Sequence, residues 1–247
     1  MTRYGATNSI VVTASTMTNW EKVASTKWGI YVTEVEKRAI MKAHSLAPHP
    51  TQALEVGCEG GRWSKMLADL GWRMTCIDVD REALEVCRLK VPQATCALAD
   101  RGDRTLPCDS SSVALLLCIE VAPVIQSDWF LSEAFRALNS GGIFVGVFWN
   151  RMSWRGLQAR VRFQMNPRAD ADFYSRSYPA WRRTIQGTGF RLVYEEGFCW
   201  SPFGRSSNSP LIPVFVQMER LLGLRHFTAI SPWIAIIAQK GAATDRK

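Results

Sequence analysis

Short apolar runs alternate with amphipathic segments through the middle of the chain. Runs with few polar residues predict strands of a parallel sheet, because such strands are covered on both faces. We expect strands over 52–56, 72–77, 94–99, 113–118 and 143–149. Apolar residues at helical spacing predict helices over 61–70, 81–90 and 128–138, the last closed by the residues 139–142. Regular alternation of strand and helix is typical of an α/β fold with a doubly wound, mostly parallel sheet.

Beyond residue 150 this alternation loosens. An arginine-rich insertion covers 151–178, and a second insertion over 201–228 is punctuated by proline, serine and glycine but carries an amphipathic stretch over 214–222. The remaining pattern predicts a helix over 179–186 and strands over 190–195 and 231–239. The two insertions therefore lie outside the regular α/β pattern.

Length and composition bound the domain organisation. With 247 residues, 47% of them hydrophobic, the chain is long enough for one full α/β domain with elaborations. We expect an N-terminal helical cap over 1–45, and a domain over 46–247 in which the insertions 151–178 and 201–228 form a substrate lid. No run approaches the roughly 18 apolar residues of a membrane span, and the first residues lack the apolar core of a signal peptide, so we expect a cytoplasmic protein.

Cysteine, histidine and charge narrow the chemistry further. The seven cysteines form no CxxC pair and no cluster with the three histidines, which predicts reduced core thiols and no metal site. The net charge of +8 is concentrated between residues 151 and 191, a stretch that contains nine arginines and two aspartates. Such a block either forms a solvated basic face or attracts an anionic substrate, a nucleic acid or an acidic membrane surface.

One glycine-rich turn carries most of the functional information. Gly57 and Gly61 lie between the first predicted strand and the following helix, whose first amides can hold an anion. Asp78 ends the next strand, 21 positions beyond Gly57, which is close to the spacing of a carboxylate that binds a ribose. A nucleoside-containing cofactor follows. The dinucleotide pattern GxGxxG is not met, because Glu59 and Arg62 occupy its later glycine positions.

Several segments, in order, resemble the class I S-adenosylmethionine (SAM)-dependent methyltransferases, especially the small-molecule type. They are the turn 54–61, Ile77-Asp78, Ala99-Asp100-Arg101, Leu106-Pro107, Cys118-Ile119-Glu120-Val121, and 133–138 with Gly141-Gly142. The likeness spans about residues 50–150. It implies a seven-stranded sheet with an antiparallel last strand, SAM as cofactor and S-adenosylhomocysteine as product. The cofactor-binding residues that it implies are Glu55, Gly57, Cys58, Glu59, Gly61, Asp78, Val79, Asp100, Arg101 and Cys118.

One position departs from the family pattern. Glu59 stands where the family has its middle glycine, with Gly60 beside it. Its carboxylate would meet the methionine end of SAM, where it either pairs with the amino group or repels the carboxylate. We favour the pairing.

The transferred methyl group of SAM is already activated, so the protein mainly has to position the acceptor. An oxygen or nitrogen acceptor also needs a base, for which Glu120 is our first candidate and His226 our second. The mixture of arginines and aromatic residues over 151–178 suits an anionic or aromatic small molecule. An RNA-directed methyltransferase, a nucleotide-sensing scaffold without turnover, and a nicotinamide-dependent oxidoreductase stay open as alternatives. The oligomeric state cannot be read from the sequence.

Overall fold

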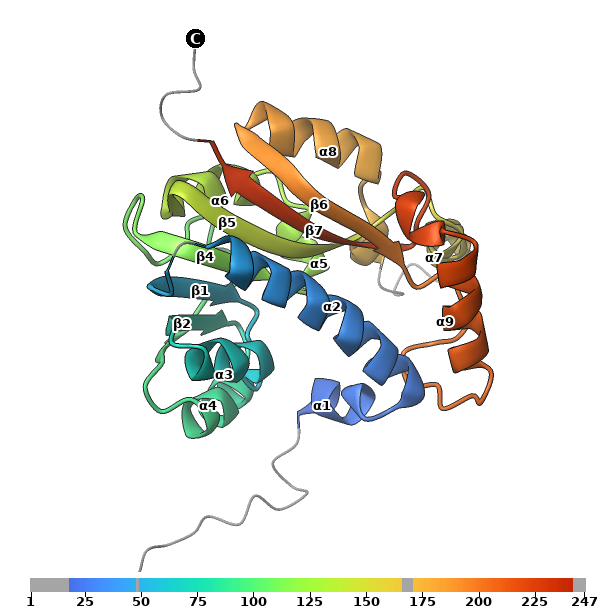
Figure 1. Cartoon of the computed structure of the whole chain (residues 1–247), viewed down its shortest axis with the longest axis horizontal. Coiled ribbons are helices and arrows are strands. Elements are labelled where there is room, and N and C mark those ends of the chain that lie inside the picture. The colour runs from blue at the N-terminus through green and yellow to red at the C-terminus, as the bar shows by residue number, and fades with distance from the viewer. Residues whose placement is uncertain (1–17, 48, 166–170, 242–247) are drawn as a thin grey trace, which may run out of the picture.

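The computed structural model describes residues 18–47, 49–165 and 171–241. Its centre is a seven-stranded sheet in the order β3-β2-β1-β4-β5-β7-β6, with helices on both faces (Figure 1). The strands are β1 (Gln52–Val56), β2 (Arg73–Asp78), β3 (Thr95–Leu98), β4 (Val113–Cys118), β5 (Leu138–Trp149), β6 (Phe190–Phe198) and β7 (Trp233–Lys240). Only β7 runs against its neighbours among these strands, pairing antiparallel with β5 and with β6. The expected mostly parallel, doubly wound sheet is confirmed.

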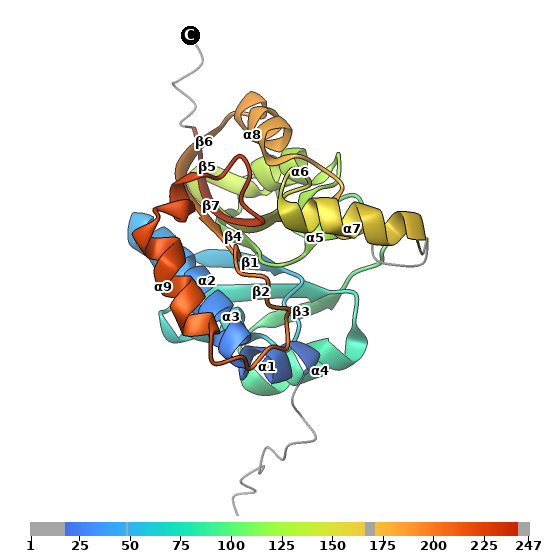
Figure 2. The same ribbon diagram turned by 90° about the vertical axis from the view of Figure 1, so that its right-hand side faces the viewer.

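Helices connect the strands and extend the ends of the fold. They are α1 (Asn19–Ala24), α2 (Lys27–Leu46), α3 (Arg62–Asp69), α4 (Arg81–Lys90), α5 (Ala122–Ile125), α6 (Phe130–Ala137), α7 (Trp154–Met165), α8 (Tyr178–Gly187) and α9 (Ile212–Leu221). Two short 3-10 helices, η2 (Ala171–Tyr174) and η3 (Leu224–His226), follow α7 and α9. Figure 2 shows α7 and α9 projecting on opposite sides of the sheet.

The sheet separates two hydrophobic cores. Alternate residues of β4 point to opposite faces, so that Leu115 and Leu117 belong to one core and Leu116 to the other. The first core contains buried side chains of α2, α3 and α4, and the second contains those of α5, α6 and α8. Burial of β4 over its whole length explains why its sequence is a continuous apolar run.

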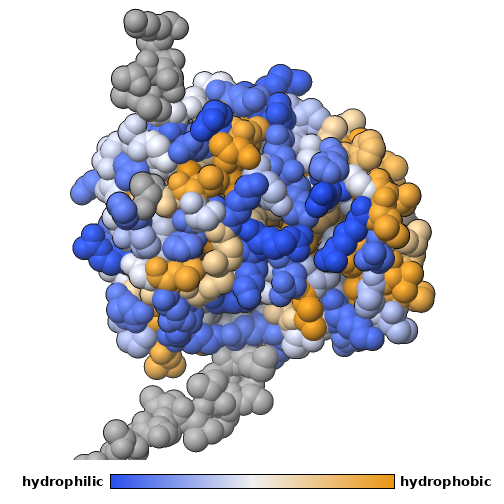
Figure 3. All heavy atoms as spheres, in the orientation of Figure 1, coloured by the Kyte–Doolittle hydropathy of each residue, from blue (hydrophilic) through white to orange (hydrophobic). Residues whose placement is uncertain are grey.

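Local signals account for several helix boundaries. The side chain of Asp80 accepts hydrogen bonds from the backbone N–H groups of Glu82 and Ala83, which confirms the expected cap of α4. Thr18 and Glu21 form a capping box at the start of α1. At the other end of the chain, apolar residues of α9 such as Val214, Met218 and Leu221 are exposed, and Figure 3 shows apolar side chains gathered over this part of the surface.

The structure corrects the boundary near residue 138. The sequence predicts that 139–142 closes a helix, but α6 ends at Ala137 and these residues open β5. Leu138 pairs with Val113 of β4, so the sheet begins earlier than the apolar run at 143 indicates. The insertion over 151–178 also contains the helix α7. None of the helices in the described ranges combines the length and the apolarity that a bilayer crossing requires.

Candidate active site

A cavity of about 1030 Å³ opens where β1, β2 and β4 end. This is the edge at which open α/β sheets bind ligands, and the volume suits a large cofactor with a substrate beside it. The structure brings nine of the predicted site residues to its wall: Glu55, Gly57, Cys58, Glu59, Asp78, Val79, Asp100, Arg101 and Glu120. Residues from four separate stretches of sequence therefore share one cavity.

Close packing explains why the turn after β1 needs glycine. Gly57 has a φ of 72°, and a Cβ placed there would lie 2.3 Å from a methyl carbon of Val121. Gly61, with a φ of 75°, packs so closely on α4 that its Cβ would lie 2.6 Å from the sulfur of Cys87. Both positions therefore require a left-handed backbone and no side chain. Gly61 supports the turn from behind and does not line the cavity.

Asp78 and Glu59 hold the turn against β2. The backbone N–H of Glu59 donates to one carboxylate oxygen of Asp78 at 2.8 Å, and the other oxygen accepts from the N–H of Asp80 at 3.0 Å. Glu59 has a φ of 47°, unusual for a residue with a side chain. Its carboxylate accepts from the N–H of Trp20 at 2.9 Å, and burial raises the pKa of this carboxyl. Glu59 thus ties α1 to the cofactor turn.

Glu55 is buried beneath the same turn. Its carboxyl is paired with the hydroxyl of Ser64 in α3. Burial raises the pKa of Glu55 to about 8, so the side chain is protonated at neutral pH. Although the residue touches the cavity wall, its side chain serves to join β1 to α3.

Glu120 lies at the other side of the cavity, directly after β4. Its carboxylate forms an ion pair with Arg205, and its φ of 58° places it in the left-handed region. The fully buried Glu36 of α2 is its neighbour, and burial followed by the charge of Glu120 raises the pKa of Glu36. Arg62 balances this acidic pair, because its guanidinium lies 2.9 Å from a carboxylate oxygen of Glu36.

Arg205 covers a group of tryptophans. The carbon of its guanidinium lies 4.8 Å from the ring centre of Trp149, 5.4 Å from Trp20 and 5.6 Å from Trp233. These distances fall within the range of cation–π attraction. Arg205 and Trp20 line the cavity, and Trp149 and Trp233 lie behind the guanidinium, outside the cavity wall.

Sequence reasoning missed Arg62 and Arg205 as site residues. Arg62 follows the glycine turn at once, so its position at the start of α3 was a usable signal. Arg205 lies in the loop between β6 and α9, and no local pattern marks it. Of the aromatic residues near the N-terminus, Trp20 reaches the cavity, whereas Trp28 and Tyr31 pack with the core.

Besides Gly61, two predicted residues do not line the cavity. His226 is exposed on η3, where its Nε2 accepts from the side chain of Arg225, and it does not line the cavity wall. Because it does not line the cavity, we do not assign it a catalytic role. Cys118 is completely buried in the sheet at the end of β4 and is a packing residue.

The arginine block is dispersed over the structure. Arg182 pairs with Glu195, Arg176 pairs with Asp128, and Arg155 binds backbone carbonyls of the loop after β6. Arg160 and Arg162 are exposed on α7, and Arg168 lies outside the described residues. The described part of the block is therefore no continuous basic surface.

Comparison with known proteins gives one family. Residues 54–146 match the family model described as a methyltransferase domain. A probable SAM-dependent methyltransferase of Mycolicibacterium smegmatis is 29% identical over 105 residues, which are 41% of this chain and 39% of that protein. The chain thus matches well under half the length of this curated relative.

Solved structures share the fold at low sequence identity. A SAM-dependent methyltransferase from Methanosarcina mazei has a TM-score of 0.57 at 15% identity, covering 81% of this chain and 96% of its own. A geranyl diphosphate methyltransferase solved in complex with SAM has a TM-score of 0.60 at 12% identity, covering 90% of this chain and 91% of its own. Residues 54–146 therefore match a methyltransferase domain, and the chain as a whole has the fold of these SAM-dependent methyltransferases.

Proposed function

We propose that this protein transfers the methyl group of SAM to a small organic acceptor and releases S-adenosylhomocysteine. The observation that carries this proposal is the open cavity between the turn after β1 and Asp78 at the end of β2. In-line transfer needs the acceptor atom aligned about 3 Å from the methyl carbon, and that alignment is the main contribution of the protein.

The residues around the cavity fit an adenosyl group. Asp78 has a carboxylate on the cavity wall, where it can accept hydrogen bonds from two ribose hydroxyls. Val79, Leu98 and Leu106 supply an apolar wall of the kind that a flat base needs. Asp100 and Arg101 stand at the rim, where the carboxylate of Asp100 can accept from an exocyclic amino group.

The methionine end of SAM fits the opposite part of the cavity. We assign its amino group to the carboxylate of Glu59, which uses one oxygen for the N–H of Trp20. Gly57 and Cys58 line the wall beside it, so the backbone of the turn can approach the ligand closely. The guanidinium of Arg62 supplies a positive charge near the carboxylate end.

The acceptor belongs on the side of Glu120 and Arg205. Glu120 is the one predicted base that lines the cavity. We propose that its carboxylate accepts the proton of the attacking atom when that atom carries one. Arg205 is 44% exposed with one carboxylate partner, so its other N–H groups can bind a carboxylate or phosphate of the acceptor. We therefore propose an anionic small molecule, held below a lid to which the described parts of the insertions, 151–165, 171–178 and 201–228, contribute.

An RNA acceptor finds less support. A nucleic acid needs a continuous basic track for its phosphates. Arg155, Arg176 and Arg182 are occupied by internal partners, which leaves exposed arginines at separate places. This arrangement favours a single anionic group bound at Arg205.

Calorimetry tests the cofactor assignment. We expect SAM and S-adenosylhomocysteine to bind and NAD not to bind. Asp78→Asn should weaken SAM binding by about 1–3 kcal/mol, the scale of hydrogen bonds lost to a charged group. Asp80→Asn is the matched control, because Asp80 caps α4 and does not line the cavity. Binding of NAD alone would overturn the proposal, and equal affinities for the two variants would remove Asp78 from the site.

A screen with methyl-labelled SAM tests the acceptor class. Small-molecule extracts and RNA fractions are incubated separately with the protein, and label transferred to acidic metabolites is the expected result. Label in RNA alone would replace the small-molecule acceptor by the RNA-directed alternative. SAM binding without transfer to either fraction would favour the scaffold.

A further inference from the structure

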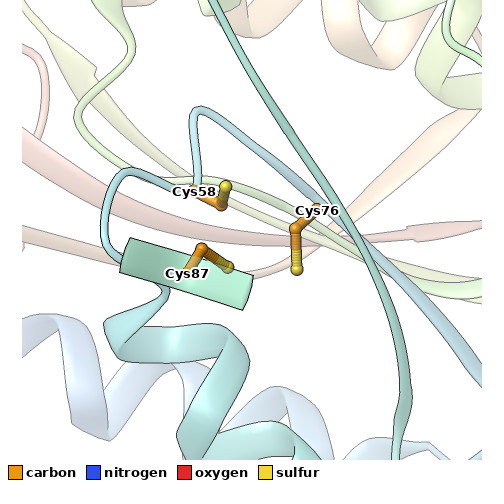
Figure 4. Close-up of side chains that lie close together, drawn as sticks. All are labelled: Cys58, Cys76 and Cys87. Carbon is orange, nitrogen blue, oxygen red and sulfur yellow. The ribbon is translucent and has the colours of Figure 1, made fainter. Parts of the chain in front are cut away.

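Three buried cysteines converge behind the cofactor turn. Cys58 lies in the turn itself, Cys76 in β2 and Cys87 in α4, and Figure 4 shows their side chains close together. Their sulfur atoms all lie within 4.8 Å of one another. None is in a disulfide, and each is at most 3% exposed. Residues that are far apart in sequence therefore form one compact group of thiols.

A fourth cysteine borders this group. Cys96 of β3 is the register partner of Cys76 in the parallel sheet, and its sulfur lies 3.9 Å from that of Cys87. Unlike the other three, Cys96 is only partly buried. It offers a route by which an ion could enter from solvent.

The spacing of the sulfurs is near that of a metal–thiolate site. A zinc–sulfur bond is about 2.3 Å long, so the sulfurs of a tetrahedral site are roughly 3.8 Å apart. The widest separation among the three buried sulfurs has to contract by no more than about 1 Å. Sulfur donors select soft or borderline ions such as Zn²⁺ over Mg²⁺ or Ca²⁺.

The surroundings also suit a negatively charged metal–thiolate centre. The hydroxyl of Ser64 lies 3.0 Å from the sulfur of Cys76 and donates to Glu55, so it can donate to a bound thiolate when the protonated carboxyl of Glu55 donates to Ser64 instead. Arg88 donates to the carbonyl oxygen of Cys96 at 3.1 Å, which places a positive charge beside the outer ligand.

We propose that Cys58, Cys76 and Cys87 bind one structural zinc ion behind the cofactor turn, and that Cys96, which lies outside the group of sulfurs within 4.8 Å of one another, moves inward from beside Cys87 as the fourth ligand. Binding forms four zinc–sulfur bonds and releases the four thiol protons to solvent. The ion would join the turn to β2, β3 and α4, and so hold Cys58 on the wall of the cavity. The proposed methyl transfer does not depend on this site, because no thiolate takes part in it.

Metal analysis of the full chain tests the proposal. The protein is purified with reducing agent and dialysed against buffer containing added Zn²⁺ and then against metal-free buffer, and its zinc is measured by mass spectrometry. We expect about one zinc per chain. A second sample is treated with a chelator and loaded with Co²⁺, and it should show the absorption spectrum of cobalt bound tetrahedrally by thiolates. Cys76→Ser should lose most of the zinc. Cys118→Ser, which alters a buried cysteine outside the group, should retain it.

Folding must be separated from metal binding. Cys76 is fully buried, so its replacement can disturb folding by itself. Cys96 is partly exposed, and Cys96→Ser therefore serves as a second variant. Far-ultraviolet circular dichroism checks the fold of both variants. Zinc removal should lower the melting temperature of the wild type and leave that of Cys76→Ser unchanged. The absence of zinc and of a cobalt spectrum in a folded, fully reduced wild type would overturn the proposal. So would equal zinc in wild type, Cys76→Ser and Cys96→Ser.

Discussion

Gly57 and Glu59 show how single residues shape the cofactor turn. Both have positive φ angles, but only Gly57 has a neighbour that excludes a side chain, since Val121 occupies the place of a Cβ. Glu59 carries its strained backbone because its N–H and its carboxylate are both bonded. The turn is therefore held by Asp78 on one side and by α1 on the other.

Replacing Gly57 by alanine should damage both stability and cofactor binding. The new Cβ would lie 2.3 Å from Val121, so either the turn or the residues that follow β4 must move. We expect a loss of about 1–3 kcal/mol in the free energy of unfolding, measured by urea denaturation, and weaker SAM binding by calorimetry.

Gly187→Ala is the matched control for this change. Gly187 ends α8 and has open space where a Cβ would be placed, so alanine should be tolerated there. The double variant Gly57→Ala/Val121→Ala should recover part of the lost SAM affinity. Equal stabilities of Gly57→Ala and Gly187→Ala would show that the turn is not tightly packed.

At the scale of elements, the loop over 199–209 links α7 to α2 above the acceptor side of the cavity. The guanidinium of Arg155 in α7 donates to the carbonyl oxygens of Cys199, Ser201 and Phe203 at 2.6 to 3.0 Å. On the other side, the N–H of Trp28 in α2 donates to the carbonyl oxygen of Ser207 at 3.1 Å. Arg205 is presented to the cavity by this doubly anchored loop.

Arg155→Ala should loosen this loop without touching the cofactor. Hydrogen exchange should become faster over 199–209, because three carbonyl groups lose their partner. Once an acceptor is known, its KM should rise by about tenfold while SAM affinity stays constant, the effect of losing roughly 1.4 kcal/mol of acceptor binding. Arg160→Ala alters an exposed arginine of the same helix and should change neither quantity. Unchanged exchange in Arg155→Ala would mean that α2 alone positions the loop.

At the scale of the whole molecule, several carboxyl groups lie within the packed structure. Burial raises the pKa values of Glu36, Glu55 and Glu219, each of which is hydrogen-bonded to a residue of another element. A protonated carboxyl in the native state becomes ionised on unfolding at neutral pH. These groups therefore make the stability of the fold depend on pH.

Glu55→Gln should reduce that dependence. The native pKa of about 8 lies above the ordinary value of 4.5, so the native state keeps a proton that the unfolded state has lost. The contribution of Glu55 to the unfolding free energy is complete below pH 4.5 and declines toward pH 8, by roughly 1.4 kcal/mol per pH unit. Urea denaturation between pH 5 and pH 8 should therefore show a shallower decline in the variant. Glu85→Gln, on the exposed face of α4, should follow the wild type. Parallel curves for Glu55→Gln and wild type would contradict a protonated Glu55.

The cofactor edge of the fold could be predicted because its signals are local. The bounds of β1, β4 and α4 match the expected ranges, since a continuous apolar run or a helical period bounded by a cap depends only on neighbouring residues. The start of β5 was wrong, because the pairing of Leu138 with Val113 is a contact between strands. The assignment of individual residues to SAM stays a prediction.

The sequence by itself determined the order of strands and helices, the glycine turn and the acid that follows it, because periodicity and spacing act along the chain. Only the tertiary structure decided that Arg205 meets Glu120, that His226 does not line the cavity, and that three cysteines far apart in sequence lie together, with a fourth beside them. Contacts of this kind depend on sheet register and on how helices pack, which join residues far apart in sequence. A spacing rule based on CxxC pairs cannot find such a cluster.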